Sequence, residues 1–122
     1  MSKITLAAAT LALAVTFAPQ AMAQDAAAGE KAFRACAACH TVEAGKNKAG
    51  PHLAGVVGRK AAAVEGFSYS KALQESGLTW DEATLDKWLA DPKGTVPGNK
   101  MVYAGQKNEQ TRKDLIAYLA SK

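Results

Sequence analysis

The chain has 122 residues, of which 48% are hydrophobic and 21% charged, and its formal net charge is +4 at pH 7. A chain of this length predicts one small domain whose apolar core is thin by itself. The slight basic excess is mixed with acidic residues, so it does not indicate nucleic-acid binding, and no internal repeat or phosphate-binding glycine loop is visible.

The first 23 residues predict an export signal. Lys3 gives a positive start, residues 4–18 form an uncharged apolar run, and residues 21–23 read Ala-Met-Ala, a small-residue cleavage site. The apolar run of about 15 residues is shorter than the roughly 20 that a membrane-spanning helix requires. We therefore expect cleavage after Ala23, a single domain over residues 24–122, a periplasmic location and no stable membrane insertion.

The remaining chain predicts an all-α domain, because four helical blocks are separated by turn residues and no sustained alternating strand pattern occurs. Residues 79–82 match a capping box at the start of the third block, and Asp91-Pro92 marks its end. We expect helices from a cap at Asp25 to about Ala38, from Ser70 to Ser76, from about Trp80 to Ala90, and from about Asn108 onward.

The last helix carries an apolar stripe and needs a partner. The first helix can supply it, because Gly29 lets two helix backbones approach closely. The stripe consists of Leu115, Tyr118 and Leu119.

Residues 36–40 read Cys-Ala-Ala-Cys-His and hold both cysteines of the chain. The C-x-x-C spacing suits an exported thiol oxidoreductase, but the βαβ pattern of such proteins is not visible. A structural disulfide would close too small a loop to stabilise much. Zinc would also require His52, and the spacing of the two histidines is outside the usual range.

Covalent haem attachment explains all three residues of the motif and supplies the missing core. The thiols of Cys36 and Cys39 add to the haem vinyl groups, and His40 ligates the iron. This is the interpretation that the residues favour most.

Few residues of the chain are candidates for the sixth iron ligand. Met1 and Met22 leave with the signal, so Met101 is the only remaining thioether. Methionine is usually a core filler, but Met101 lies in a turn-rich loop, and His/Met ligation is typical of electron transfer. Ligation by His52 or an open sixth position remains an alternative.

The pattern as a whole resembles class I cytochrome c, of the bacterial c2 type and similar to mitochondrial cytochrome c. The resemblance covers essentially residues 25–122, in the family's order and spacing. The segments that carry it are GEKAFRACAACHTVEAG, GPHLAGVVGRK, GFSYSKAL, GLTWDEATLDKWLADPKGTVPGNKMVYAGQK and RKDLIAYL.

The resemblance implies a small all-α fold with ordered loops wrapped around one covalently bound haem c. It implies that Cys36 and Cys39 hold the haem, that His40 and Met101 ligate the iron, and that the Pro51 carbonyl accepts the His40 Nδ1 proton. Further haem contacts, mainly to the propionates, are implied for Arg59, Tyr69, Trp80 and, as an extra donor, Asn99.

Three positions depart from the mitochondrial pattern. Trp88 stands where a tyrosine is common, Leu73 replaces an asparagine near a buried water, and Tyr103 replaces a haem-edge phenylalanine. Each change is expected to affect the potential or the Met101 bond, since the polarity around a metal ligand tunes both.

The function that follows is a soluble periplasmic one-electron carrier between redox complexes, not an enzyme, and by default a monomer. The resemblance implies partners with acidic docking patches, such as a cytochrome bc-type donor, an oxidase, a reaction centre or a dehydrogenase. The alternative is a small haem protein that binds a gas or peroxide at an open or labile sixth position. Lysines expected around the haem edge are Lys31, Lys46, Lys48, Lys93, Lys100 and Lys107.

Overall fold

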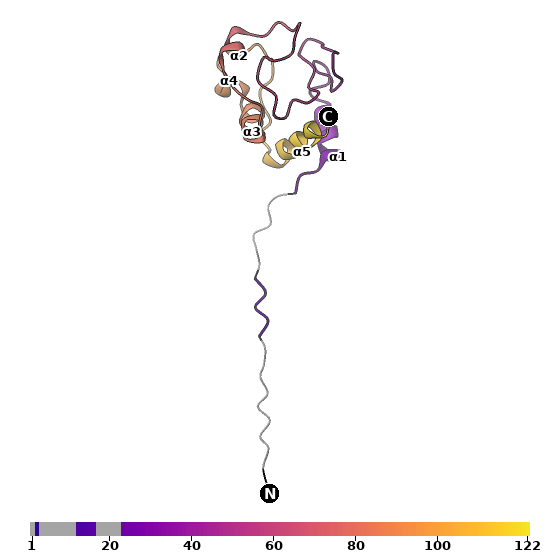
Figure 1. Cartoon of the computed structure of the whole chain (residues 1–122), viewed down its shortest axis with the longest axis vertical. Helices are drawn as coiled ribbons and strands as arrows, with labels where there is room; N and C mark the ends of the chain where they lie inside the picture. The colour runs from indigo at the N-terminus through magenta and orange to yellow at the C-terminus, as the bar shows by residue number, and fades with distance from the viewer. Residues whose placement is uncertain (1, 3–11, 17–22) are drawn as a thin grey trace.

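The structure is a computed structural model that describes residue 2, residues 12–16 and residues 23–122 (Figure 1). Most of the expected export signal therefore lies outside the described residues. Within the described part the chain forms five helices and no strand, which confirms the all-α expectation with one helix more than the four expected. The helices are α1 (Ala26–Phe33), α2 (Lys71–Glu75), α3 (Glu82–Ala90), α4 (Pro92–Thr95) and α5 (Glu109–Ala120).

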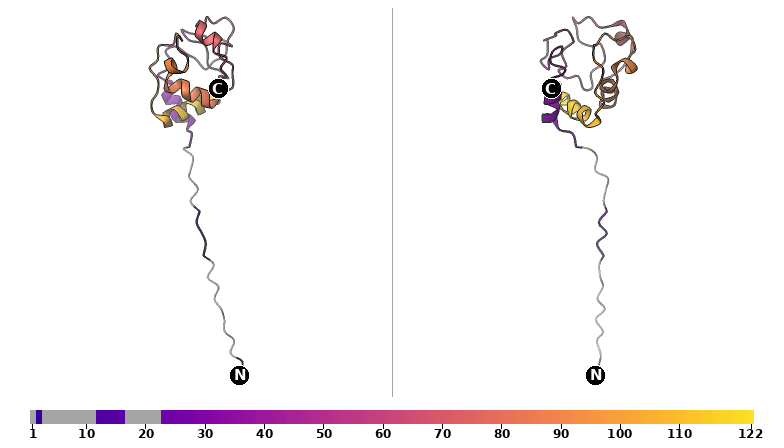
Figure 2. Two further views of the ribbon diagram at one scale, coloured as in Figure 1. Left: turned by 90° about the vertical axis from the view of Figure 1, so that its left-hand side faces the viewer. Right: turned by 180° about the vertical axis from the view of Figure 1, so that it is seen from behind.

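None of these helices has the length and apolar character needed to cross a bilayer, a finding that covers the described residues only. Figure 1 and Figure 2 show α1, α3 and α5 together at the end of the domain where the N-terminal segment enters. Long loops occupy the opposite end. The domain thus has a helical end and a loop end, and these two terms are used below.

The first helix begins as expected and ends early. The Asp25 carboxylate caps it by accepting hydrogen bonds from the N–H groups of Ala27 and Ala28, at 2.9 and 3.2 Å. Regular helix ends at Phe33 rather than near Ala38. From there hydrogen bonds that reach back three residues, as from Cys36 N to Phe33 O, mix with bonds that reach back four, and the chain forms consecutive turns.

The expected start of the third helix was wrong by two residues. Trp80 is held in extended backbone: its N–H donates to Arg59 O at 2.8 Å, and its carbonyl accepts from Gly58 N at 2.7 Å. Thr79 forms an isolated bridge with Lys60. The cap therefore falls on Asp81, whose carboxylate accepts from Thr84 N at 2.7 Å.

Helix α4 was not expected, because Asp91-Pro92 was interpreted only as a stop. Proline fits the first turn of a helix, where its missing N–H costs nothing. Pro92 begins α4, and the Asp91 carboxylate caps it by accepting from Gly94 N at 3.0 Å. The dipeptide therefore ends one helix and starts the next.

The most extensive contact between helices joins α1 and α5. A Cβ at Gly29 would overlap the Asp114 carbonyl and the Tyr118 Cβ, so only glycine permits this crossing. The rings of Phe33 and Tyr118 lie 5.4 Å apart. The buried Asp114 carboxylate accepts from Asp25 N at 2.9 Å, which ties the start of α1 to α5.

Candidate functional site

The Cys-Ala-Ala-Cys-His motif forms one turn directly after α1. The N–H groups of Cys39 and His40 both donate to the Cys36 carbonyl, at 3.1 and 2.9 Å. Cys36 is half-buried and Cys39 is exposed, and their sulfurs are not joined in a disulfide. Both sulfurs are therefore free for thioether bonds.

His40 is oriented by the loop that follows. Its Nδ1 lies 2.7 Å from the Pro51 carbonyl oxygen, the contact that the resemblance implies. Since a carbonyl oxygen only accepts, Nδ1 carries the proton of this hydrogen bond and Nε2 keeps its lone pair. Nε2 is the atom that a metal ion would bind.

Gly50 makes room for the His40 ring, a role that the sequence analysis missed. A Cβ at Gly50 would overlap the ring at Cε1, Nδ1 and Nε2. The two segments are also paired, because Gly50 N donates to Cys39 O at 2.8 Å and Leu53 N to Thr41 O at 2.7 Å. The only sequence signal was a glycine directly before Pro51.

The state of the thiols argues against the oxidoreductase alternative. Burial raises the pKa of the Cys36 thiol, and the neighbouring Cys39 thiol raises it further. A thiol oxidoreductase needs a lowered pKa, because the thiolate is the nucleophile. For zinc, no cluster of three or more His, Cys, Asp or Glu ligands is found among the described residues.

Arg59 bonds to carbonyls of its own loop and also has a buried nitrogen without a partner among the described residues. Its Nη1 donates to the carbonyls of His52 and Ala54, at 3.0 and 3.2 Å. Its Nε is buried and has no hydrogen-bond partner in the described part of the chain. Burial lowers the pKa of Arg59, while nearby Tyr69 acts in the opposite direction. A buried guanidinium N–H without a partner fits a carboxylate such as a haem propionate.

Tyr69 and Trp80 lie in the environment of Arg59. The Tyr69 hydroxyl oxygen accepts from Val64 N at 3.1 Å, which leaves its own hydrogen available to donate. Trp80 pairs with the Arg59 backbone and is only 6% exposed. These contacts are compatible with a propionate site, and the propionate roles themselves stay predictions.

The Asn99 amide is engaged differently from the expected extra propionate donor. Its Nδ2 donates to the carbonyls of Pro92 and Val96, at 3.0 and 2.9 Å. Its Oδ1 accepts from Met101 N at 2.9 Å. Asn99 therefore joins α4 to the backbone of Met101, whose side chain is half-buried against the core.

The three departures from the mitochondrial pattern have distinct surroundings. Trp88 packs on Trp80 with ring centroids 5.1 Å apart, and among the described residues it makes no hydrogen bond to Met101. Leu73 is half-buried against the core. Burial raises the pKa of the Tyr103 hydroxyl, and the Cys36 thiol raises it further.

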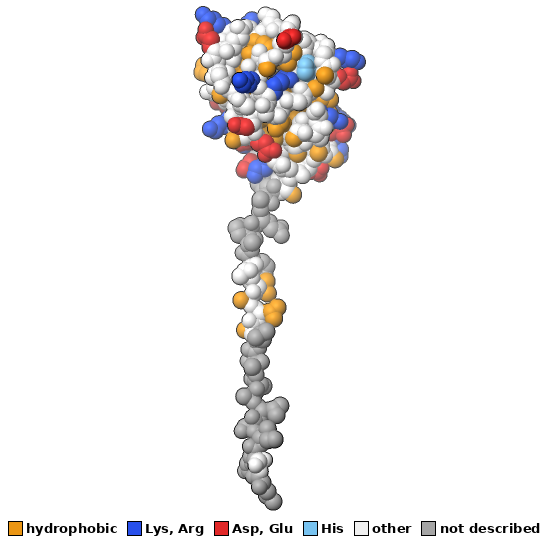
Figure 3. All heavy atoms as spheres, viewed as in Figure 1, with side chains coloured by type: hydrophobic (Ala, Val, Ile, Leu, Met, Phe, Trp, Pro, Cys, Tyr) orange, Lys and Arg blue, Asp and Glu red, His pale blue; other side chains and the backbone are white. Residues whose placement is uncertain are grey.

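The six lysines expected around the haem edge are all exposed, and several have partners. Lys46 pairs with Glu43 at 2.7 Å, and the ammonium groups of Lys48 and Lys107 donate to the carbonyls of Ala37 and Ala90. On the face shown in Figure 3, basic side chains occur at separate places among acidic ones. That face therefore has no continuous basic patch.

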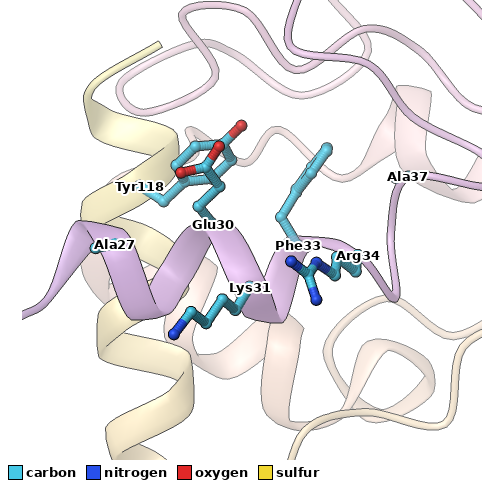
Figure 4. Close-up of a pocket in the computed structure, with 7 residues that line it drawn as sticks. All are labelled: Ala27, Glu30, Lys31, Phe33, Arg34, Ala37 and Tyr118. Carbon is cyan, nitrogen blue, oxygen red and sulfur yellow. The ribbon is translucent and has the colours of Figure 1, made fainter.

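A separate pocket of about 470 Å³ lies beside α1 and is not the attachment site (Figure 4). Glu30 and Phe33 extend on the side of α1 that faces Tyr118, whereas Lys31 and Arg34 point away from it. The pocket brings together no thiol, imidazole or thioether.

Comparison with known proteins agrees with this geometry. The family model "Cytochrome c" matches residues 26–122. The chain is 62% identical to cytochrome c2 iso-2 of Magnetospirillum fulvum over 74% of its length and 94% of that protein. It is 50% identical to cytochrome c2 of Blastochloris viridis, over 88% of this chain and 84% of the relative.

A solved structure shows the same fold. Cytochrome cH from Methylobacterium extorquens is 56% identical, with a TM-score of 0.77 over 80% of this chain and 99% of that one. These matches confirm the resemblance on which the site was interpreted. The chain belongs to the cytochrome c family, whose members carry haem c bound covalently at a C-x-x-C-H motif.

Proposed function

We propose that this protein is a periplasmic carrier that moves one electron at a time between redox protein complexes. Its family and its cytochrome c2 relatives place it among the haem electron carriers of respiratory or photosynthetic chains. The observation that carries the proposal is the hydrogen bond of His40 Nδ1 to the Pro51 carbonyl, directly beside the two free cysteines. This hydrogen bond leaves the lone pair of His40 Nε2 available to bind iron.

Haem c, when bound through Cys36 and Cys39, supplies an iron that accepts and releases one electron. His40 and Met101 are the side chains that would ligate the iron. If both bind it, the protein itself would occupy the places that a substrate on the metal would need. The protein therefore transfers electrons without catalysing a reaction of its own.

The surrounding residues favour the reduced state. A thioether is a neutral, weakly basic ligand, so Met101 bound to the iron would stabilise its ferrous over its ferric state. Arg59 holds a positive charge next to the region proposed for the propionates, and its loop carbonyl contacts fix that charge in place. Apolar side chains keep water away; they include Leu53, Leu89 and Leu119.

The decisive test of the ligand set is the visible spectrum of the purified ferric and ferrous protein. Ferric haem with methionine sulfur has a weak far-red band, and we expect it in the wild type and not in Met101→Ala. Carbon monoxide should bind the ferrous wild type poorly and the variant readily. A haem spectrum without the far-red band, with ready carbon monoxide binding, would support an open sixth position instead.

The partners are proposed to be redox complexes with acidic docking surfaces, reached in the periplasm after removal of residues 1–23. The exposed lysines would steer such encounters, so the association rate should fall steeply with ionic strength. Stopped-flow kinetics of electron transfer to an acidic redox partner, recorded from about 10 to about 300 mM salt, measure this rate. Over this range the Debye length falls from about 30 Å to below about 8 Å, so charge steering is progressively screened. A flat salt dependence would remove the lysine-steering part of the proposal.

A further inference from the structure

The loop of residues 96–108 carries Met101 and is attached to the fold at two places. On one side Asn99 bonds to the Met101 backbone, and on the other Gln106 N donates to the end of α3 at 2.7 Å. Between them, in the part of the chain that the structure describes, no backbone N–H of residues 102–105 donates a hydrogen bond to the protein. The backbone on either side of Met101 is therefore held by hydrogen bonds only at these two attachments in the described part of the chain.

Arg112 on α5 builds the second attachment. Its Nε donates to Asp86 Oδ1 on α3 at 2.7 Å, and its Nη1 donates to the carbonyls of Gln106 and Lys107 at 3.1 and 3.2 Å. The Arg112 side chain is only 13% exposed. Such partly desolvated, charge-assisted hydrogen bonds are stronger than those between exposed neutral groups. One side chain thus joins two helices to the end of the loop.

The end of the loop also lies directly on α3. Gly105 has a φ of +106°, and a Cβ there would overlap the Ala90 carbonyl. The Lys107 ammonium donates to the same carbonyl at 2.6 Å. Because the chain passes so close to α3, loss of the Arg112 contacts would let the loop separate from the helix rather than settle deeper.

We propose that Arg112 is a positioning residue for Met101. By holding the carbonyls of Gln106 and Lys107 beside Asp86, it raises the free energy that the loop needs to swing away from the iron. A competing ligand gains the sixth position only when the loop is open, so its apparent affinity reports that opening. The inference rests on the proposed ligation by Met101.

The test is a titration of the ferric holoprotein with imidazole, which competes with Met101 for the iron. Arg112→Gln should raise the apparent affinity for imidazole by about tenfold or more, the factor that one charged hydrogen bond commonly provides. Arg112→Lys should have an intermediate effect, because an ammonium keeps the charge but not the fork of donors. The amide of Gln106 should also exchange hydrogen faster in Arg112→Gln.

Two controls separate positioning from general stability. Lys113→Gln removes a neighbouring charge of α5 that pairs with Glu109 at 3.3 Å, and it should leave imidazole affinity unchanged. Gly29→Val disturbs the α1–α5 crossing, so it should lower the unfolding midpoint with little effect on imidazole affinity.

Equal changes of imidazole affinity in Arg112→Gln and Gly29→Val, or no change in Arg112→Gln, would overturn the inference while the proposed function stands. If the wild type lacks the far-red band, Met101 ligation itself fails, and the inference falls with it before any variant is made.

Discussion

The helical end and the loop end of the domain are stabilised in different ways. At the helical end, α1 and α5 pack backbone on backbone at Gly29, and the rings of Phe33 and Tyr118 meet across the crossing. At the loop end, Arg59 keeps a buried N–H without a partner in the described part of the chain. Among the described residues, no buried side-chain donor or acceptor of the helical end lacks a partner, whereas the loop end has a polar group that a bound carboxylate would satisfy.

The difference between the two ends explains how a thin apolar core can support long ordered loops. A buried unpaired donor costs roughly 1–3 kcal/mol, so a fold retains one mainly where a ligand will use it. The loop end holds His40 against Pro51 and Gly50, and it anchors Met101 through Asn99. We infer that these contacts orient the ligands while the haem supplies the missing packing.

Removal of the haem is expected to have the largest effect on the difference between the two ends. Replacing Cys36 and Cys39 by serine should abolish attachment and most of the roughly 5–15 kcal/mol of stability typical of a domain. Hydrogen exchange should show the loop end fully open, including the amides of Leu53 and Trp80, which bond to loop carbonyls. Some protection should remain in α5.

The control for this experiment is Ala38→Ser, which changes an exposed residue of the same turn and keeps both thiols. It should retain haem and full protection. Equal protection of both ends in the haem-free protein would contradict the distinction drawn between them.

The helical end is tested by Gly29→Val. The added side chain overlaps the Asp114 carbonyl and the Tyr118 Cβ, so the two helices must separate. Overpacking of this kind costs about 3 kcal/mol. Guanidinium unfolding of the holoprotein measures it, with Glu30→Ala, an exposed site on α1, as the neutral control. An unchanged midpoint in Gly29→Val would mean that the crossing is not close-packed.

The sequence predicted the helices best where local signals were strong. The cap at Asp25 was predicted correctly. The helices expected from Ser70 and near Asn108 begin directly after these two residues, which act as their caps. The prediction failed at Trp80 because a long-range backbone pairing with Arg59 overrides a good local capping box. Such pairing has no signature within a few residues.

The residues of the candidate site were also predictable only in part. The motif itself carries the positions of Cys36, Cys39 and His40, and the resemblance carries Met101. The supporting role of Gly50 was not predictable, because it depends on the His40 ring, which Gly50 meets only after folding. Asn99 bonds within its own stretch of chain, to the carbonyls of Pro92 and Val96, but helix α4 there was not expected. Arg112 was missed because it joins segments that meet only after folding. One of its acceptors is Asp86 on α3, and the other two are the carbonyls of Gln106 and Lys107.

A smaller effect at the loop end is expected for Gly50→Ala. The new methyl group overlaps the His40 ring, so the ring must turn or move and the hydrogen bond to Pro51 lengthens. We expect a loss of about 2 kcal/mol in unfolding free energy, within the range for overpacked sites. Unlike Gly29→Val, it should also change the visible spectrum of the ferric protein. Ala49→Ser, an exposed neighbour, is the control, and an unaltered spectrum in Gly50→Ala would show that His40 does not depend on this glycine.

The smallest expected effects compare one helix cap from each end of the domain. Ser70 Oγ caps α2 by accepting from Leu73 N at 3.1 Å, and Asn108 Oδ1 caps α5 by accepting from Thr111 N at 2.9 Å. Replacing either residue by alanine costs about 1 kcal/mol of helix stability.

If the helical end unfolds only with the whole domain, Asn108→Ala should lower the global unfolding free energy by that amount. If α2 opens locally, Ser70→Ala should leave the global value almost unchanged and speed hydrogen exchange of the Leu73 amide about fivefold, since about 1 kcal/mol corresponds to that factor. Equal global losses in both variants would show that the two ends unfold as one unit.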